Sequence, residues 1–126
     1  MDMLKQQIID EAATVIINVE FFGKNAHSSR PERGINALSS VLTLFNTIDQ
    51  LRPTLDMNDK INGVITDGGK AGNIIPGYAS CKFAVRANTM EEVEKLSGII
   101  ANIVDTANKI HGTTSKITTT PCCDER

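Results

Sequence analysis

The chain is predicted to fold as an α+β, ferredoxin-like two-layer sandwich, with a four-stranded antiparallel sheet that carries two helices on one face. Three observations predict this. Apolar residues alternate along residues 15–22 and 78–87, they recur at spacings of three and four along 34–51 and 89–112, and polar turn signals separate these segments. The resulting order is β-α-β-β-α-β. Right-handed crossovers then place the fourth strand beside the first, followed by the third and the second.

The first strand is predicted over 15–22 because this segment is β-branched and aromatic, and its alternate residues share one apolar face. The first helix is predicted over 34–51, since Pro53 follows it and its apolar residues keep the helical period. Those residues are Ile35, Leu38, Val41, Leu42, Phe45, Ile48 and Leu51.

A short second strand over 61–66 ends in a Gly68-Gly69 turn, and it is expected at a sheet edge. The third strand, 78–87, alternates an apolar face with a polar face that carries Lys82 and Arg86. Because both helices are expected on the other side, this polar face is open unless another domain or subunit covers it.

The second helix is predicted to begin at a capping box formed by Thr89 and Glu92, and to end at Gly112 in a left-handed conformation. Its apolar residues are Val93, Leu96, Ile99, Ile100, Ile103, Val104, Ala107 and Ile110. The final strand, 113–120, is rich in Thr and suits a second sheet edge.

At 126 residues the chain fits one domain, expected over 14–120, with 1–13 as a lead-in and 121–126 as a polar tail. The lead-in lacks the pattern of a signal peptide, and no apolar run approaches the roughly 18 residues of a membrane span. A net charge of -2 and 4% aromatic residues argue against nucleic acid as a partner. A soluble protein without a membrane partner is expected.

The cysteines and histidines suggest neither a disulfide framework nor a metal site. Cys81 lies in a predicted strand and Cys122 and Cys123 are adjacent in the tail, which leaves an odd count and favours a reducing cytoplasm. No Cys-x-x-Cys, His-x-x-x-His or His-Glu-x-x-His spacing is present. We therefore expect this chain to bind no metal or cofactor of its own.

Three polar residues follow or end predicted strands, so they are the candidate site residues and are expected to lie on one rim of the domain. His27 follows the first strand, Asn73 follows the Gly68-Gly69 turn, and Arg86 lies near the end of the third strand. Each also has an ordinary structural explanation: a solvated loop histidine, a flexible connection and a surface charge. Chemically, however, imidazole can donate to an oxyanion, an amide can orient a carboxylate or amide, and guanidinium suits bidentate carboxylate recognition.

Their spacing resembles a known family. His27, Pro31, Gly34 and Asn36-Ala37, then Gly68-Gly69 with the Asn73-to-Pro76 segment, then Arg86, are similar to the lid or dimerisation domain of dizinc aminoacylases and carboxypeptidases. These are metallopeptidases and amidohydrolases, and the match, from Gly23 to Gly112, looks most like the N-acyl amino acid amidohydrolase branch. The histidine, asparagine and arginine of that family imply a catalytic, oxyanion-binding role for His27 and substrate-binding roles for Asn73 and Arg86.

The resemblance also implies partners. It predicts a homodimer through the edge strand 61–66 and the first helix, and a catalytic domain in the same polypeptide that holds two divalent ions, zinc or manganese, and cleaves small amides. The metal-ligand motifs of that domain are absent here, so the chain alone is expected to be inactive. The alternative is a free-standing ferredoxin-like regulatory module that binds a small molecule without His27, Asn73 and Arg86.

Overall fold

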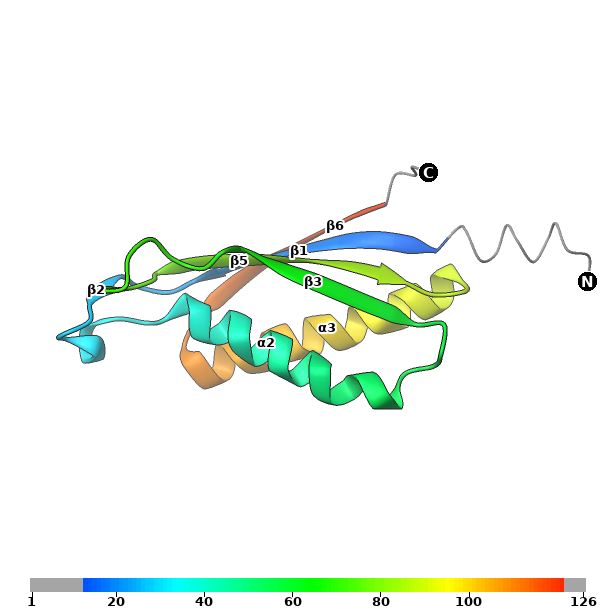
Figure 1. Cartoon of the computed structure of the whole chain (residues 1–126), viewed down its shortest axis with the longest axis horizontal. Helices are drawn as coiled ribbons and strands as arrows, with labels where there is room; N and C mark the ends of the chain where they lie inside the picture. Colours follow the sequence, from blue (N-terminus) through cyan, green and yellow to red (C-terminus); the bar gives the residue numbers. More distant parts are fainter. Residues whose placement is uncertain (1–12, 122–126) are drawn as a thin grey trace, which may run out of the picture.

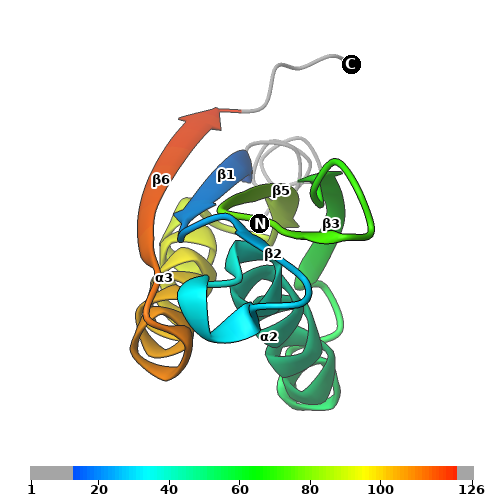
Figure 2. The same ribbon diagram turned by 90° about the vertical axis from the view of Figure 1, so that its left-hand side faces the viewer.

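A two-layer sandwich is present in the computed structural model, which describes residues 13–121. The main sheet is antiparallel, with the strand order β3 (Lys60–Asp67), β5 (Tyr78–Arg86), β1 (Thr14–Phe22) and β6 (Thr114–Pro121). Both long helices, α2 (Ala37–Leu51) and α3 (Met90–His111), cover one of its faces (Figure 1). Viewed from the end, the four strands form one layer and α2 and α3 lie side by side in the other (Figure 2). The predicted fold class and strand order are confirmed.

The strands and helices have the following bounds: β1 Thr14–Phe22, β2 Ala26–His27, α2 Ala37–Leu51, β3 Lys60–Asp67, β4 Ile74–Ile75, β5 Tyr78–Arg86, α3 Met90–His111 and β6 Thr114–Pro121. Short 3-10 turns occupy Pro31–Arg33 and Arg52–Thr54. No helix within residues 13–121 is both long enough and apolar enough to cross a lipid bilayer. Cys122 and Cys123 lie outside the described residues.

The core lies between the helices and the inner faces of β1 and β5. Alternate residues of both strands are buried, as predicted, and Ile17 of β1 stands opposite Phe83 of β5. Cys81 belongs to the same buried face, and burial raises the pKa of its thiol to about 12. Because the thiolate is the reactive form, Cys81 is a core residue with no nucleophilic role.

Helix α2 differs from its prediction in its start and in its buried face. It begins at Ala37 instead of Gly34, because the Asn36 side chain accepts hydrogen bonds from the N–H groups of Leu38 (3.0 Å) and Ser39 (3.4 Å) and so caps the helix. Leu42, predicted to face the core, is 47% exposed, and Leu44 is buried instead.

Ser40 shows why the buried face of α2 was misjudged. Its hydroxyl is fully buried and lies 2.7 Å from the Thr113 hydroxyl, so the polar group is satisfied inside the core. Hydropathy leaves Ser40 out of the apolar face predicted for this helix. The apolar face is therefore turned relative to the prediction, and Leu42 is left partly exposed on α2.

Helix α3 agrees with its prediction apart from half of the capping box. The Thr89 hydroxyl accepts from the Glu92 N–H at 3.1 Å, and Gly112 ends the helix with a φ of 79°. The Glu92 carboxyl, however, lies within 4.8 Å of the Asp59 carboxyl, whereas a capping box directs it to the Thr89 N–H. Ile110, also predicted to be apolar and inward, is 62% exposed.

Gly63 provides a direct test of this packing. A Cβ atom at this position of β3 would lie 2.4 Å from two ring carbons of Phe83, whose ring also packs against Phe45 at a centroid distance of 4.9 Å. Gly63→Ala is therefore expected to lower the free energy of unfolding by about 1–3 kcal/mol, measured by urea denaturation. Gly98→Ala is the control, since its Cβ would meet nothing within 4 Å. Equal stability of Gly63→Ala and the unmodified chain would contradict the packing.

Candidate functional site

Two glycines hold the loops at one end of the sheet in close contact. The Gly23 N–H donates to the Gly77 carbonyl at 2.8 Å, and the Gly77 N–H donates to the Asn25 side-chain oxygen at 2.6 Å. A Cβ at Gly23 would lie 2.2 Å from the Ile35 carbonyl oxygen, and one at Gly77 would lie 2.6 Å from the Asn25 nitrogen. Only glycine permits this approach, so the geometry of both loops is fixed.

This close approach builds a second, two-stranded sheet from β2 and β4 that the sequence analysis missed. Its two antiparallel pairs join Ala26 to Ile75 and His27 to Ile74. The Ser28 N–H then donates to the Asn73 carbonyl at 2.9 Å. Two candidate residues that are far apart in sequence, His27 and Asn73, are thus brought together on neighbouring backbone segments.

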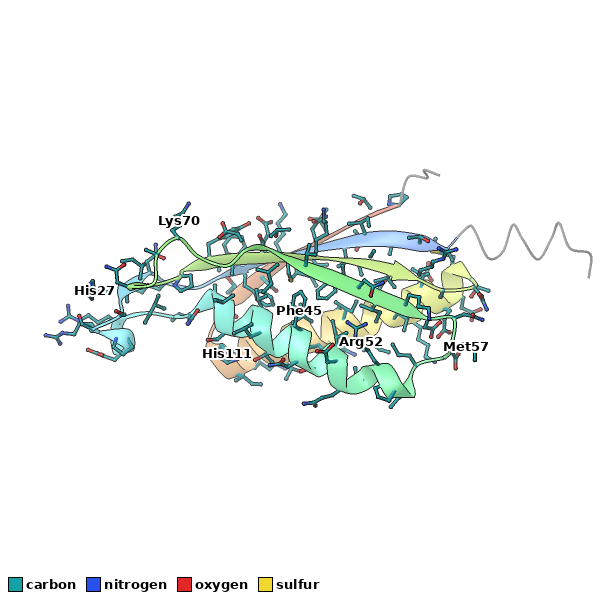
Figure 3. All side chains as sticks on the ribbon, in the orientation of Figure 1. His27, Phe45, Arg52, Met57, Lys70 and His111 are labelled. Atoms are coloured by element: carbon teal, nitrogen blue, oxygen red, sulfur yellow. The ribbon has the colours of Figure 1, made fainter. Side chains whose placement is uncertain are left out.

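The His27 side chain is exposed at the tip of this end of the molecule (Figure 3). Its Nδ1 atom lies 3.1 Å from the backbone nitrogen of Ser29 and 2.9 Å from the Ser29 hydroxyl. The ring borders an open hollow of about 550 Å³ whose rim also includes Lys24, Arg30 and Arg33. An exposed histidine in this setting can donate a hydrogen bond to a ligand held against the hollow.

Arg86 lies at the opposite end of the sheet. Strand β5 has 9 residues, so its ends are about 26 Å apart at about 3.3 Å per residue. Tyr78 follows the Gly77 contact at the His27 end, whereas Arg86 pairs with Thr14 and Lys60 near the far end, which Met57 marks in Figure 3. The expectation that His27, Asn73 and Arg86 share one rim is therefore wrong within a single chain.

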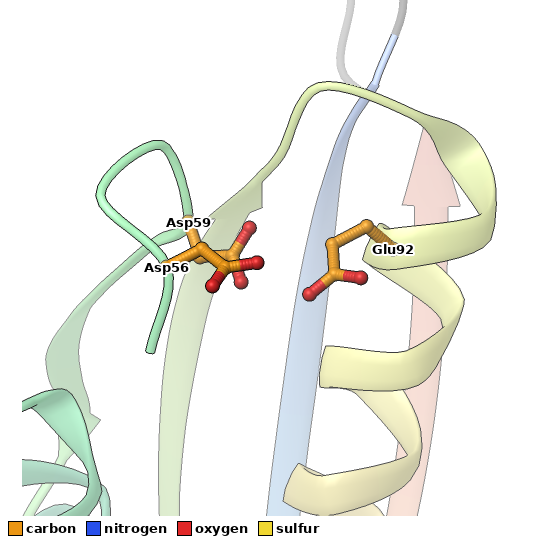
Figure 4. Close-up of side chains that lie close together, drawn as sticks. All are labelled: Asp56, Asp59 and Glu92. Atoms are coloured by element: carbon orange, nitrogen blue, oxygen red, sulfur yellow. The ribbon is translucent and has the colours of Figure 1, made fainter. Parts of the chain in front are cut away.

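Three carboxylates gather at that far end, and the sequence analysis did not single them out. Oxygen atoms of Asp56, Asp59 and Glu92 lie within 4.8 Å of one another, and the side chains point toward a common centre (Figure 4). Within residues 13–121, they form a group of carboxylates close enough together to supply oxygen ligands to one divalent ion. The Asp-x-x-Asp spacing was visible in sequence, but Glu92 joins only through the fold.

This cluster predicts a pH effect on stability. The hydrogen bond with Asp59, partial burial and the nearby negative charges of Asp59 and Asp56 raise the pKa of Glu92 above 4.5, while Lys95 opposes the shift. The folded chain then keeps this proton to higher pH than the unfolded chain does. The stabilising effect of that proton is present below pH 4.5 and is lost as the pH rises through the folded-state pKa.

The melting temperature of Glu92→Gln is therefore expected to fall less steeply than that of the unmodified chain as the pH rises above 4.5. A series of thermal unfolding curves at different pH values measures this. Glu91→Gln is the control, because it removes the same charge from the same helical turn and Glu91 is not in the cluster. If both variants keep the pH dependence of the unmodified chain, the Asp59–Glu92 interaction is not what controls it.

Parts of two curated proteins are similar in sequence to this chain. It is similar to the Xaa-Arg dipeptidase of Homo sapiens, with 33% identity over 82 residues that cover 64% of this chain and 19% of that protein. It is also 34% identical over 92 residues to a probable carboxypeptidase of Ajellomyces capsulatus, covering 63% of this chain and 21% of that protein. The chain thus spans about a fifth of the length of these curated relatives.

Solved structures share the fold. The aminobenzoyl-glutamate utilization protein of Klebsiella pneumoniae matches with a TM-score of 0.76 and 20% identity, over 87% of this chain and 28% of that chain. A tripeptidase of Staphylococcus aureus matches with a TM-score of 0.73 and 20% identity, over 86% and 28%.

The peptidase dimerisation domain family model matches residues 12–112, which is most of the chain. This range contains β1 to α3, and with them both helices and the small sheet that carries His27. The chain belongs to the peptidase dimerisation domain family.

Proposed function

We propose that this chain is the dimerisation and substrate-lid domain of a metal-dependent amidohydrolase or peptidase that cleaves N-acyl amino acids or small peptides. The observation that carries the proposal is the small β2–β4 sheet, which holds an exposed His27 beside Asn73. His27 donates a hydrogen bond to the oxyanion that develops at the scissile carbonyl, and Asn73 orients the substrate. The catalytic domain of the same polypeptide holds the two divalent ions.

A homodimer is supported by the edge of the main sheet. Strand β3 is an edge strand, and its Val64 and Ile65 side chains are 55% and 43% exposed. Leu38 and Ile65 both approach Gly68, and Leu42 lies one turn beyond Leu38 on α2. These side chains, Leu38, Leu42, Val64 and Ile65, form an apolar strip beside the outward N–H and C=O groups of the edge strand β3. A second subunit related by a two-fold axis would cover the strip and pair with those backbone groups.

The distance between His27 and Arg86 also favours a dimer. Groups beyond the two ends of a strand about 26 Å long cannot both contact one small substrate within one chain. When two β3 strands pair antiparallel around a two-fold axis, the His27 end of one subunit lies on the same side as the Arg86 end of its partner. Arg86 then pairs with the substrate carboxylate in a site that the partner completes with His27 and Asn73.

Mixed dimers of the full-length enzyme test this arrangement. One subunit carries His27→Ala and the other lacks its metal ligands, so neither homodimer has a complete site. If His27 acts across the interface, the mixture is expected to regain about one working site for each heterodimer, measured as amide hydrolysis. Mixtures that stay inactive although both subunits fold and dimerise would exclude the trans role. The 126-residue chain alone should show no hydrolysis in the same assay.

A further inference from the structure

We infer that Ser29 is a positioning residue that fixes the tautomer of His27, with the imidazole proton on Nε2. The contacts of the Nδ1 atom with Ser29 set this tautomer. Its catalytic meaning rests on the proposed function, in which His27 is a hydrogen-bond donor. Ser29 does not touch the substrate in this scheme; it acts through His27.

The Ser29 backbone N–H makes the His27 Nδ1 atom a hydrogen-bond acceptor. A backbone N–H can donate a hydrogen bond and cannot accept one, and this nitrogen lies 3.1 Å from Nδ1 of His27. The Nδ1 atom must therefore present its lone pair. In a neutral imidazole one nitrogen carries the proton and the other accepts, so the proton is on Nε2.

The Ser29 hydroxyl adds to this preference, because it lies 2.9 Å from the same Nδ1 atom and can rotate to donate. A proton on Nδ1 would face the Ser29 N–H directly and lose that bond. Ser29 thus contributes a backbone N–H, which can only donate, and a hydroxyl, which can donate or accept.

The backbone around His27 keeps the ring near Ser29. His27 pairs with Ile74 in the small sheet, and its carbonyl accepts from the Arg30 N–H at 2.9 Å. The next residue, Ser28, donates its N–H to the Asn73 carbonyl. Because the chain is fixed on both sides of His27, the Nδ1 contacts persist without a ligand.

His27 is therefore left with one ring N–H donor, the Nε2–H group. Within residues 13–121, Nε2 of His27 has no hydrogen-bond partner, and the ring is exposed beside the hollow. An Nε2–H group held in this way can donate to an oxyanion without first changing its protonation, which is the geometry that preorganised stabilisation requires.

Nitrogen-15 NMR of the 126-residue chain tests the tautomer directly. At about pH 9 free imidazoles are neutral, and long-range proton–nitrogen correlations distinguish the protonated ring nitrogen from the unprotonated one. The chain has 2 histidines, so a His27→Gln variant assigns the signals by subtraction. We expect Nε2 of His27 to carry the proton. A ring protonated mainly on Nδ1 would overturn the inference.

Two substitutions test whether Ser29 is the cause. Ser29→Ala removes the hydroxyl and keeps the N–H, and it should move the tautomer ratio about two- to ten-fold toward Nδ1–H, as expected for one hydrogen bond. Ser29→Asp places a carboxylate, which only accepts, beside Nδ1 and should move the ratio further. Ser28→Ala is the matched control and should change nothing. An unchanged ratio in both Ser29 variants would overturn the role of Ser29.

The full-length enzyme separates this inference from the proposed function. If Ser29→Asp shifts the tautomer and lowers kcat while KM stays near its original value, both stand. The tautomer could instead shift as expected while neither Ser29→Asp nor His27→Ala changes hydrolysis. In that case Ser29 does fix the tautomer of His27, but His27 does not stabilise the oxyanion. If hydrolysis falls without any shift of the tautomer, Ser29 has another role and the inference fails.

Discussion

Replacement of His27 by Ala in the full-length enzyme is expected to lower kcat roughly 10²–10³-fold, the effect of removing one oxyanion donor. The physical reason is that the hydrogen bond from Nε2 strengthens as negative charge develops on the carbonyl oxygen, so its loss raises the barrier more than it weakens substrate binding. Steady-state kinetics on a dipeptide and an N-acyl amino acid measure kcat and KM separately.

The fold should tolerate this change. His27 is exposed and its side chain bonds only to Ser29 in the described chain, so the free energy of unfolding should change by about 0.5 kcal/mol or less. Arg86→Ala is the comparison: it should mainly raise KM, because a carboxylate contact holds substrate and transition state alike. A kcat of His27→Ala within about three-fold of the unmodified value would exclude the oxyanion role.

The long strands and helices were predictable from sequence because burying one face of an element requires apolar residues that recur with the period of that element. Strand β1 is buried at every second residue, and this repeats the apolar alternation in its sequence. Local capping chemistry also fixed the start of α3 at Thr89 and its end at Gly112. These signals need no knowledge of distant residues.

The site was less predictable because its geometry depends on contacts between distant segments. The β2–β4 sheet has only two residues in each strand and is too short to show a period. It forms because Gly23 and Gly77 let two loops approach closely. The position of Arg86 likewise follows from the direction of β5 and its length, and motif order along the chain does not reveal that distance.

The homodimer provides the second large expected effect. Leu42→Glu in the full-length enzyme is expected to raise the dimer dissociation constant by about 10³-fold. A two-fold axis duplicates the substitution, and each carboxylate buried without a partner costs about 2 kcal/mol or more. Leu42 is 47% exposed on the apolar strip beside β3, where hydropathy had predicted a core residue. Sedimentation equilibrium over a range of protein concentrations measures the constant.

Ile110→Glu is the matched control for this substitution. Ile110 is an apolar helix residue with 62% exposure, but it lies on α3, which packs beside β6 away from the β3 edge. The control should leave dimerisation and hydrolysis unchanged. Leu42→Glu should lose both together, since a site that takes His27 and Arg86 from different subunits cannot work in a monomer. A Leu42→Glu protein that is monomeric yet fully active would show that one subunit holds a complete site, whereas an intact dimer would place the interface elsewhere.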